Sequence, residues 1–173
     1  MGPPVTVIET DRLSLRRLTG EDAPFILELL NDPGWLRYIG DKGVRNLDDA
    51  RRYILTGPVD MYARRGFGLY LTSLKEGGQP IGLCGLLRRE GLDDPDIGFA
   101  FLPPFRGQGY AHEAAAATLA YGRGELGLTR IVAITSPDNE RSARLLEKLG
   151  LKFEGMTRLT PEAEEVRLFA PAP

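Results

Sequence analysis

The order of hydrophobic and polar residues predicts that the chain opens with two short strands followed by a helix. Apolar residues alternate with polar ones over residues 5–8 and again over residues 12–18, which is the period of a strand. Thr19 stands three residues before Asp22, which is the spacing of a helix N-cap, and apolar residues then follow at helical intervals. We expect the Asn-Asp-Pro-Gly run at 31–34 to end this helix.

A second helical pattern covers residues 47–65, and the Gly57-Pro58 pair is expected to kink or divide it. A short aromatic segment with Trp35 and Tyr38 lies between the two helices. One interpretation of these two aromatic residues is that they cover the hydrophobic core. The sequence alone does not exclude a second interpretation, in which they line a pocket.

The middle of the chain predicts three successive antiparallel strands. Apolar residues alternate over residues 67–74 and 81–88, and the paired glycines between these runs favour a hairpin. A polar turn then leads to a third apolar run at 96–102. Beyond it we expect an alanine-rich helix at 111–124, a strand at 130–135, a helix at 139–149 that ends at Gly150, and strands at 151–159 and 165–169.

Composition limits the classes of function that the chain can have. Its 173 residues suit one domain, 1–173, with a sizeable core. The net charge is −2 and basic residues occur at most in pairs, so the sequence does not favour nucleic acid as a ligand. No apolar run is long enough to span a membrane, and we expect a cytoplasmic protein. Cys84 is the only cysteine and His112 the only histidine, which excludes an internal disulfide and argues against a metal site.

One turn between the third strand and the alanine-rich helix has the composition of an anion site. A helix begins with backbone N–H groups that have no partner inside the helix, and its dipole adds partial positive charge there. Glycines let a phosphate approach the backbone closely, and an arginine can bind phosphate oxygens in pairs. We call this segment, residues 105–111, the glycine turn. It comprises Phe105, Arg106, Gly107, Gln108, Gly109, Tyr110 and Ala111.

The spacing Arg106-x-x-Gly109-x-Ala111, between a strand and a helix, resembles the acetyl-CoA signature of the GNAT N-acetyltransferases. The run from Pro137 to Gly155 is similar to the next helix and strand of that family. The opening Thr-Asp-Arg-Leu-Ser-Leu-Arg at 10–16 resembles the ribosomal-protein alanine acetyltransferase branch. A dinucleotide-binding turn is disfavoured, because His112 occupies the third glycine position and the predicted strands are antiparallel.

The resemblance implies an α+β (α/β) GNAT fold. Its central twisted sheet would have six to seven mostly antiparallel strands, splayed in a V, with about four flanking helices. The pantetheine arm of acetyl-CoA would lie in the V as an added strand. It would be bound there by main-chain groups of Phe99, Ala100 and Phe101, while the glycine turn holds the diphosphate.

The resemblance also suggests catalytic residues. Ser142 occupies the position at which the ribosomal-protein branch uses a serine to protonate the departing thiolate. Helical spacing places Ser142 on the face of Leu145, Leu146 and Leu149, which we expect to be buried. A buried serine bonded to its own helix is the alternative interpretation. Asn139 is either a helix cap or a pantetheine contact, and many relatives have a tyrosine at the position of Leu146.

Asp96 lies where relatives place an acidic residue, and it is our candidate for the general base. A plain turn aspartate is the alternative. In the family, the segment with Trp35 and Tyr38 usually lines the acceptor pocket. The implied function is acetyl-CoA-dependent acetylation of a primary amine, either a protein N-terminus or a small molecule. An inactive acyl-CoA-binding sensor or interaction domain is the rival, and homodimers are common among relatives.

Overall fold

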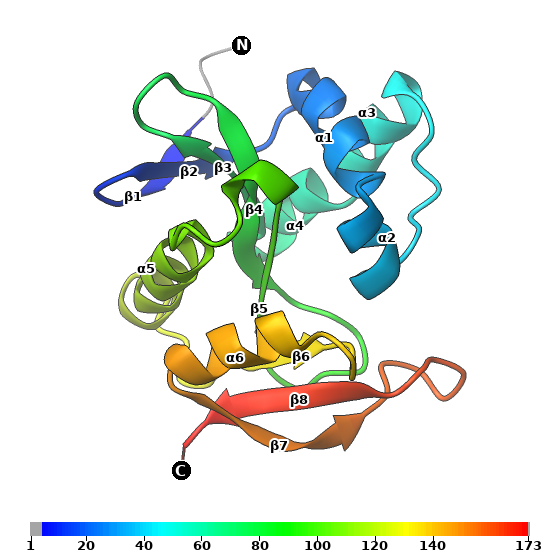
Figure 1. Cartoon of the computed structure of the whole chain (residues 1–173), viewed down its shortest axis with the longest axis vertical. Helices are drawn as coiled ribbons and strands as arrows, with labels where there is room; N and C mark the ends of the chain where they lie inside the picture. Colours follow the sequence, from blue (N-terminus) through cyan, green and yellow to red (C-terminus); the bar gives the residue numbers. More distant parts are fainter. Residues whose placement is uncertain (1–4, 173) are drawn as a thin grey trace.

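The computed structural model describes residues 5–172, whose strands form two sheets (Figure 1). The first sheet has five antiparallel strands in the order β1-β2-β3-β4-β5, so each strand pairs with its neighbour in sequence. These are β1 (Thr6–Glu9), β2 (Leu13–Arg17), β3 (Leu69–Leu74), β4 (Pro80–Leu87) and β5 (Asp96–Phe101). The three antiparallel strands predicted for the middle of the chain are confirmed.

The second sheet is built by the C-terminal third of the chain. Its order is β6-β8-β7, all antiparallel, with β6 (Ala133–Thr135), β7 (Leu151–Thr157) and β8 (Val166–Pro171). The predicted strand at 130–135 is shorter than expected, because only its last three residues enter a ladder. The described residues therefore contain eight strands in two sheets, where we expected six to seven in one splayed sheet.

Six α-helices and two 3₁₀ turns connect the strands of the described region. The 3₁₀ turns are η1 (Gly20–Asp22) and η2 (Pro103–Phe105). The α-helices are α1 (Ala23–Leu30), α2 (Pro33–Tyr38), α3 (Leu47–Thr56), α4 (Pro58–Arg65), α5 (Tyr110–Gly124) and α6 (Glu140–Lys148). Thr19 and Asp22 form the predicted capping box, and Gly57 divides the second helical region into α3 and α4.

The prediction was wrong about the aromatic segment at 35–39, because residues 35–38 belong to helix α2 and Ile39 is its C-cap. Asp32 caps this helix by accepting hydrogen bonds from the N–H groups of Gly34 (3.0 Å) and Trp35 (3.3 Å), and Pro33 occupies the first helical position. An aspartate followed by proline is a helix-start signal as well as a helix-stop signal, since proline at this position loses no intrahelical bond. The same residues end α1 and begin α2.

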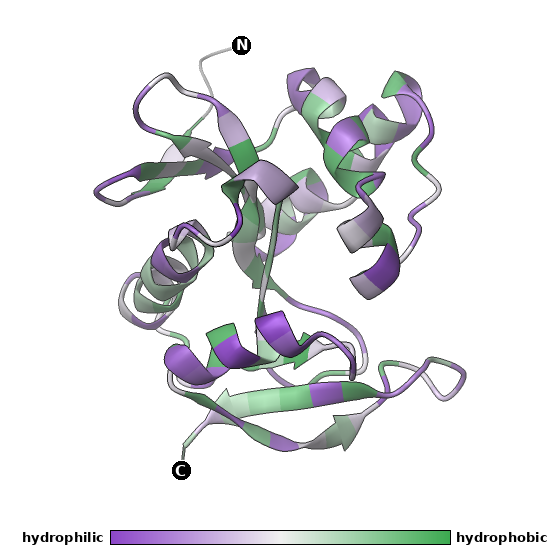
Figure 2. Cartoon of the chain, viewed as in Figure 1, coloured by the Kyte–Doolittle hydropathy of each residue, from purple (hydrophilic) through white to green (hydrophobic). Residues whose placement is uncertain are grey.

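The hydrophobic core lies on both faces of the first sheet. Alternate residues of a strand point to opposite faces, so Tyr70 and Cys84 pack in one cluster with α5, whereas Leu71 and Leu83 pack in the other with α1 and α3. Figure 1 shows α5 and the α1–α3 group on opposite sides of β4 and β5, and Figure 2 shows apolar residues concentrated where they meet the strands.

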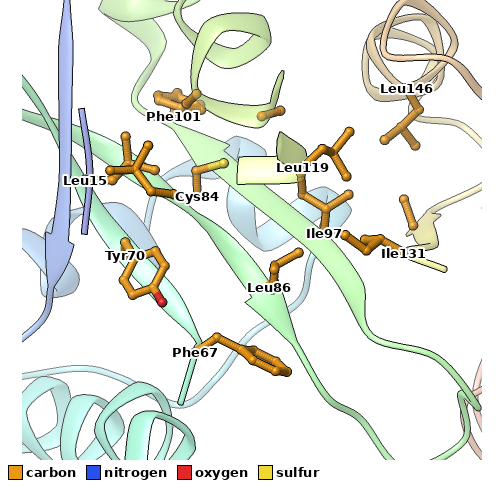
Figure 3. Packing of buried hydrophobic residues seen from close by; sticks show 14 of the residues in the cluster. Leu15, Phe67, Tyr70, Cys84, Leu86, Ile97, Phe101, Leu119, Ile131 and Leu146 are labelled. Atoms are coloured by element: carbon orange, nitrogen blue, oxygen red, sulfur yellow. The ribbon is translucent and has the colours of Figure 1, made fainter. Parts of the chain in front are cut away.

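The cluster beneath α5 also extends to the second sheet. Leu119 of α5, Ile97 of β5 and Leu146 of α6 are each at most 2% exposed and belong to this cluster (Figure 3). Full burial of one such side chain stabilises the fold by about 1.5–3 kcal/mol. Side-chain packing therefore joins the two sheets even where their strands are not hydrogen-bonded.

Candidate active site

Strands β5 and β6 meet at one point and then diverge. The N–H of Ile97 donates to the carbonyl of Val132 (2.9 Å), and the N–H of Val132 donates to the carbonyl of Pro95 (3.0 Å). This makes a single parallel bridge between Asp96 and Val132. No ladder joins β5 to β6 beyond it within residues 5–172. The predicted V is present, with its closed end at Asp96.

A cleft of about 1070 Å³ occupies the V and continues to both of its sides. A smaller cavity of about 620 Å³ beside Phe25 and Pro104 contains none of the predicted catalytic residues. The large cleft brings together most of the residues singled out from the sequence. Those that line it are Trp35, Tyr38, Asp96, Phe99, Ala100, Phe101, Arg106, Gly107, Gly109, Ala111, Asn139 and Ser142.

Two residues of the glycine turn do not line the cleft. The side-chain amide of Gln108 donates to the carbonyl of Pro104 (2.7 Å), which stabilises the turn. Tyr110 lies beneath the guanidinium of Arg12, 4.3 Å from the ring centroid. We therefore assign these two side chains to the support of the turn.

The backbone of the glycine turn suits an anion. Gly107 (φ 75°) and Gly109 (φ 84°) adopt left-handed conformations, and a Cβ at Gly107 would meet nothing within 4 Å. Gly109 is the N-cap of α5, and no side chain caps this helix. The first intrahelical bond runs from the N–H of Glu113 to Gly109, so the three preceding N–H groups have no helical acceptor. These features fit a diphosphate at the start of α5.

The guanidinium of Arg106, which we expect to bind phosphate oxygens, also has partners within the protein. It forms an ion pair with Asp32 (Nη2 to Oδ2, 3.0 Å), and its Nε donates to the carbonyl of Phe101 (3.0 Å). The partner lies 74 residues away in sequence, so spacing gave no sign of it. In this arrangement Arg106 joins the glycine turn to α2 through its ion pair with Asp32.

Arg12 is a residue that the sequence analysis did not single out. Its Nε pairs with Glu113 of α5 (2.7 Å), and its Nη1 donates to the carbonyl of Gln108 (3.1 Å). Burial raises the pKa of Glu113, but the hydrogen bonds from Thr10 and Arg12 outweigh this effect and hold that pKa below its usual range. The β1–β2 hairpin thus fixes the start of α5.

The main-chain groups of β5 alternate between β4 and the open side of the V. Ile97 bonds to the β6 side and Leu102 bonds to Ile81 of β4. The alternation of an antiparallel strand therefore directs the groups of Phe99 and Phe101 into the V, and those of Ala100 toward β4. The expectation that the main chain of Ala100 faces a pantetheine arm was wrong, although the residue does line the cleft.

Helix α6 places Ser142 on the cleft. Asn139 caps the helix by accepting from the N–H of Ser142 (3.2 Å), in agreement with the helix-cap interpretation. The buried residues of α6 are Ala143 and Leu146, whereas Ser142 and Leu145 are half-buried and line the cleft. The buried face of α6 is therefore centred on Ala143 and Leu146, about one position away from the face of Ser142 and Leu145 that we expected to be buried. The Ser142 hydroxyl makes no hydrogen bond to any described residue, so the self-bonded serine is not observed.

Helix α6 also presents three cations to the cleft. Arg141, Arg144 and Lys148 are exposed, line the cleft, and have no carboxylate within 4 Å among the described residues. Their spacing of three and four residues places them on one side of the helix. This stripe faces the same cleft as the glycine turn and adds positive charge for a phosphorylated ligand.

Asp96 is fully buried at the closed end of the V, where it is the first residue of β5. Its two carboxylate oxygens each lie 3.1 Å from Nε of Arg89. Burial raises the pKa of Asp96, and the attraction of Arg89 opposes this increase only in part. A carboxylate with a raised pKa inside a cleft is suited to accept a proton near neutral pH.

The aromatic residues of α2 form a wall of the cleft. Trp35 is 5% exposed and belongs to the core cluster of α1 and α3, and it also borders the cleft. Tyr38 is half-buried, with the guanidinium of Arg37 4.8 Å from its ring centroid. Arg37 in turn pairs with Asp138, just before α6 (3.4 Å). Trp35 therefore packs in the hydrophobic core and also borders the cleft. The two interpretations of this segment, core cover and pocket wall, are compatible with each other.

A family model described as an acetyltransferase (GNAT) domain matches residues 12–152, a range that includes the glycine turn, the V and α6. The chain belongs to the GNAT acetyltransferase family. The family predicted from the glycine turn is confirmed, and so is its fold. The chain is therefore an N-acetyltransferase.

Individual GNAT relatives agree with this assignment. The chain is 33% identical to the uncharacterized N-acetyltransferase YoaA of Bacillus subtilis over 154 residues, which cover 88% of this chain and 86% of YoaA. A GNAT-family acetyltransferase from Bacillus anthracis superposes with a TM-score of 0.77 at 29% identity, covering 94% and 96% of the two chains. RimL, a ribosomal L7/L12 alpha-N-protein acetyltransferase solved with coenzyme A, shares the fold (TM-score 0.80, 18% identity, 96% and 97% covered).

Two further findings on this GNAT chain concern metals and membranes. Within residues 5–172, no group of three or more histidine, cysteine, aspartate or glutamate side chains is arranged to hold a metal ion. None of the helices in the same region is long and apolar enough to cross a lipid bilayer.

Proposed function

We propose that this N-acetyltransferase takes its acetyl group from acetyl-CoA and transfers it to a primary amine by direct attack of the amine. The observation that carries the proposal is the cleft itself. It runs from the uncapped start of α5, through the open side of β5, to the buried carboxylate of Asp96. In this proposal, an anion site and a proton acceptor line one passage.

The residues that would hold acetyl-CoA follow from this geometry. The N–H groups at the start of α5, with Gly107 and Gly109, would bind the diphosphate, and the cations of α6 would compensate its charge. Main-chain groups of Phe99 and the N–H of Phe101 would bind the pantetheine arm, since the carbonyl of Phe101 already accepts from Arg106, and one N–H of β5 would polarise the thioester carbonyl. Acetyl-CoA supplies an acetyl group on a thioester that an amine can attack.

The protons are handled by two side chains in this proposal. Asp96, directly or through water, takes a proton from the ammonium form of the acceptor, so that the amine nitrogen has a lone pair for the acetyl carbon. As the new C–N bond forms and the C–S bond breaks, Ser142 donates its hydroxyl proton to the departing sulfur. The second proton that the amine nitrogen must lose then returns to Ser142, directly or through water. Trp35 and Tyr38 border the acceptor and help to exclude water.

The test is the release of free thiol from acetyl-CoA with a panel of primary amines, together with calorimetric binding of acetyl-CoA. We expect amine-dependent thiol release that falls about a hundredfold in Ser142→Ala, while acetyl-CoA affinity is retained. Ser73→Ala, a serine of β3 outside the cleft, is the matched control and should keep full activity. Binding without release across the panel would instead indicate an acyl-CoA-binding domain without transfer activity.

A further inference from the structure

The acceptor end of the cleft contains a group of polar side chains that the proposed reaction does not use. Lys42 lies in the connection between α2 and α3, Tyr53 lies on α3, and Arg89 follows β4. All three line the same cleft as Asp96, although they come from separate parts of the sequence. We call Lys42, Tyr53 and Arg89 the basic corner.

The basic corner has more positive charge than the surrounding protein neutralises. Lys42 has no carboxylate within 4 Å among the described residues. Arg89 contacts Asp96 only through Nε, so its two terminal nitrogens make no hydrogen bond within the described part of the chain. These nitrogens and the Lys42 ammonium are donors that remain available to a ligand.

The other carboxylates of the cleft do not compensate for this charge. Asp32 pairs with Arg106, Asp138 with Arg37, and Glu140 with Arg167. Over its whole described lining, the cleft has six cationic side chains and four carboxylates, in a chain whose net charge is −2. The cations of α6 line the same cleft as the glycine turn, and the proposed phosphorylated ligand would account for them. Arg89 is paired with Asp96 through Nε, so the charge that remains without a partner is that of Lys42, beside the two unbonded terminal nitrogens of Arg89.

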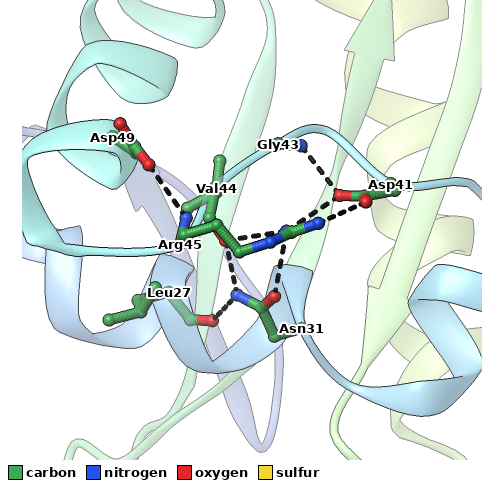
Figure 4. A network of polar contacts seen from close by, with 7 residues as sticks. All are labelled: Leu27, Asn31, Asp41, Gly43, Val44, Arg45 and Asp49. Carbon is green, nitrogen blue, oxygen red and sulfur yellow. Dashed lines mark hydrogen bonds and ion pairs between the residues drawn. The ribbon is translucent and has the colours of Figure 1, made fainter.

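The backbone on either side of Lys42 is held in place by a polar network (Figure 4). The guanidinium of Arg45 pairs with Asp41, and Asp41 also accepts from the N–H of Gly43 (2.8 Å). The amide of Asn31 donates to the carbonyls of Val44 (2.8 Å) and of Leu27 in α1 (2.8 Å). Lys42 is therefore presented to the cleft from a loop with a defined shape.

The members of the basic corner lie close enough to affect one another. Desolvation at the cleft and the charge of Arg89 both lower the pKa of Lys42, although the residue as a whole is exposed. Burial raises the pKa of Tyr53, and the charge of Arg89 opposes this increase. Two like charges in a shared, partly desolvated space favour the binding of an anion between them.

This charge conflicts with a simple amine as the acceptor. A primary amine arrives mostly as an ammonium ion, which Asp96 attracts but which Lys42 and Arg89 repel. A carboxylate on the same small molecule removes the conflict, because it can bind Lys42 and Arg89 while the ammonium approaches Asp96. Arginine binds carboxylates especially well, since its donors match their geometry.

We propose that the acceptor is a small amine with its own carboxylate, as in a free α-amino acid, and that Lys42 and Arg89 bind this carboxylate. The inference rests on the proposed function and narrows its acceptor class. The α-amine of a protein N-terminus has no free carboxylate next to it, so the basic corner would disfavour it.

The experiment compares matched acceptors. Thiol release from acetyl-CoA is measured for the free amino acids, for the corresponding amino acid amides, and for short peptides with a free α-amine. We expect kcat/KM to be at least about tenfold higher for the preferred amino acid than for its amide, because the amide loses charge-assisted hydrogen bonds. Lys42→Gln should reduce this ratio toward one, mainly through KM for the amino acid.

The control variant is Lys152→Gln, which removes an exposed lysine on β7 that lies outside the cleft and has no carboxylate partner among residues 5–172; it should leave the ratio unchanged. Equal turnover of amino acids and amides, or a preference for peptides, would overturn the acceptor class while transfer activity stands. An amino acid preference that survives Lys42→Gln would overturn the assignment of Lys42. If no amine is acetylated although acetyl-CoA binds, both the proposed function and the inference that rests on it fail.

Discussion

The two ends of the cleft are built in different ways. At the glycine turn, the available donors are backbone N–H groups; Gly107 and Gly109 are left-handed, and a Cβ at Gly107 would meet nothing within 4 Å. At the acceptor end, the available groups are the side chains of Lys42, Arg89 and Asp96, brought together from three segments. A backbone site depends on local sequence, whereas a side-chain site depends on the tertiary fold. The two ends should therefore respond differently to substitution.

The largest effect is expected from Asp96→Asn. Loss of a general base lowers kcat by about 10²–10⁴-fold, while acetyl-CoA affinity should be nearly unchanged because Asp96 lies far from the glycine turn along the cleft. Burial raises the pKa of Asp96, so its base form appears, and activity rises, as the pH increases through that raised value. Steady-state kinetics over a pH series should show this rising limb in the wild type, whereas the variant should keep only the rise that comes from deprotonation of the free acceptor amine.

Asp94→Asn is the control for this prediction. Asp94 pairs with Arg130 (3.0 Å) and lies outside the cleft, only two residues from Asp96. This variant should retain both the activity and its pH profile. If Asp96→Asn keeps the wild-type rate, Asp96 is not the general base. The ion pair between Asp96 and Arg89 would then have only a structural role.

Gly109→Val tests the backbone end of the cleft. A Cβ at Gly109 would lie 3.2 Å from Nη2 of Arg12, so a larger side chain would displace the guanidinium that bonds Gln108 and Glu113 at the start of α5. We expect acetyl-CoA affinity to fall about a hundredfold, as for the loss of two charge-assisted hydrogen bonds. Valine at a left-handed position also costs about 1–2 kcal/mol of stability. Calorimetric titration with acetyl-CoA measures the affinity, and thermal unfolding measures the stability.

Gly127→Val separates these two effects. Gly127 is also left-handed (φ 67°), a Cβ there would meet nothing within 4 Å, and it does not line the cleft. This control should lose similar stability and retain acetyl-CoA affinity. Unchanged affinity in Gly109→Val would count against a diphosphate at the glycine turn.

Asp32 caps α2, which borders the acceptor end of the cleft, and pairs with Arg106 of the glycine turn. Its substitution should therefore have a moderate effect on both ends of the cleft. Asp32→Ala removes the cap of α2 and leaves Arg106 unpaired, so we expect a loss of about 1–3 kcal/mol in unfolding free energy and a higher KM for the acceptor. Asp32→Asn keeps a capping oxygen and loses only the charge, and it should be less destabilising. Chemical denaturation measures the free energy of unfolding of both variants. If Asp32→Asn lost as much stability as Asp32→Ala, the ion pair with Arg106, and not the cap, would account for the effect of Asp32.

The smallest effect is expected from Arg37→Ala. Arg37 and Asp138 form a pair across the cleft mouth, but both side chains are more than 60% exposed. Such pairs contribute about 0–1 kcal/mol and weaken with salt. Thermal unfolding should change little, and a larger loss would indicate that packing of Arg37 on Tyr38 matters more than the charge.

The difference between the backbone site at the glycine turn and the side-chain site at the acceptor end also explains which features could be predicted from the sequence. Periodicity, caps and glycines identified most strands and helices, and the glycine turn, because each depends on residues within a few positions of one another. The ion pair of Arg106 with Asp32 and the direction of the main chain at Ala100 depend on distant partners, so they were missed. The basic corner was missed for the same reason, since nothing within 40–46 marks Lys42 as part of a cleft.

Helix α2 is an instructive intermediate case. Asp32 and Pro33 were interpreted only as a helix stop, although the same pair satisfies the start of a new helix. The local signal was present but ambiguous. What decided it was the packing of Trp35 into the core next to α1, together with the second bond of Asp32 to Arg106.

The separation of β5 from β6 after Val132 has one energetic consequence. At Phe99 the open edge of β5 is not paired with another strand of the described residues. An extended ligand can therefore form hydrogen bonds with this edge without breaking native hydrogen bonds. Folding has already supplied the free energy needed to keep that edge open, through the packing of Ile97, Leu119 and Leu146. Binding of an extended ligand at this edge therefore requires no displacement of a native strand.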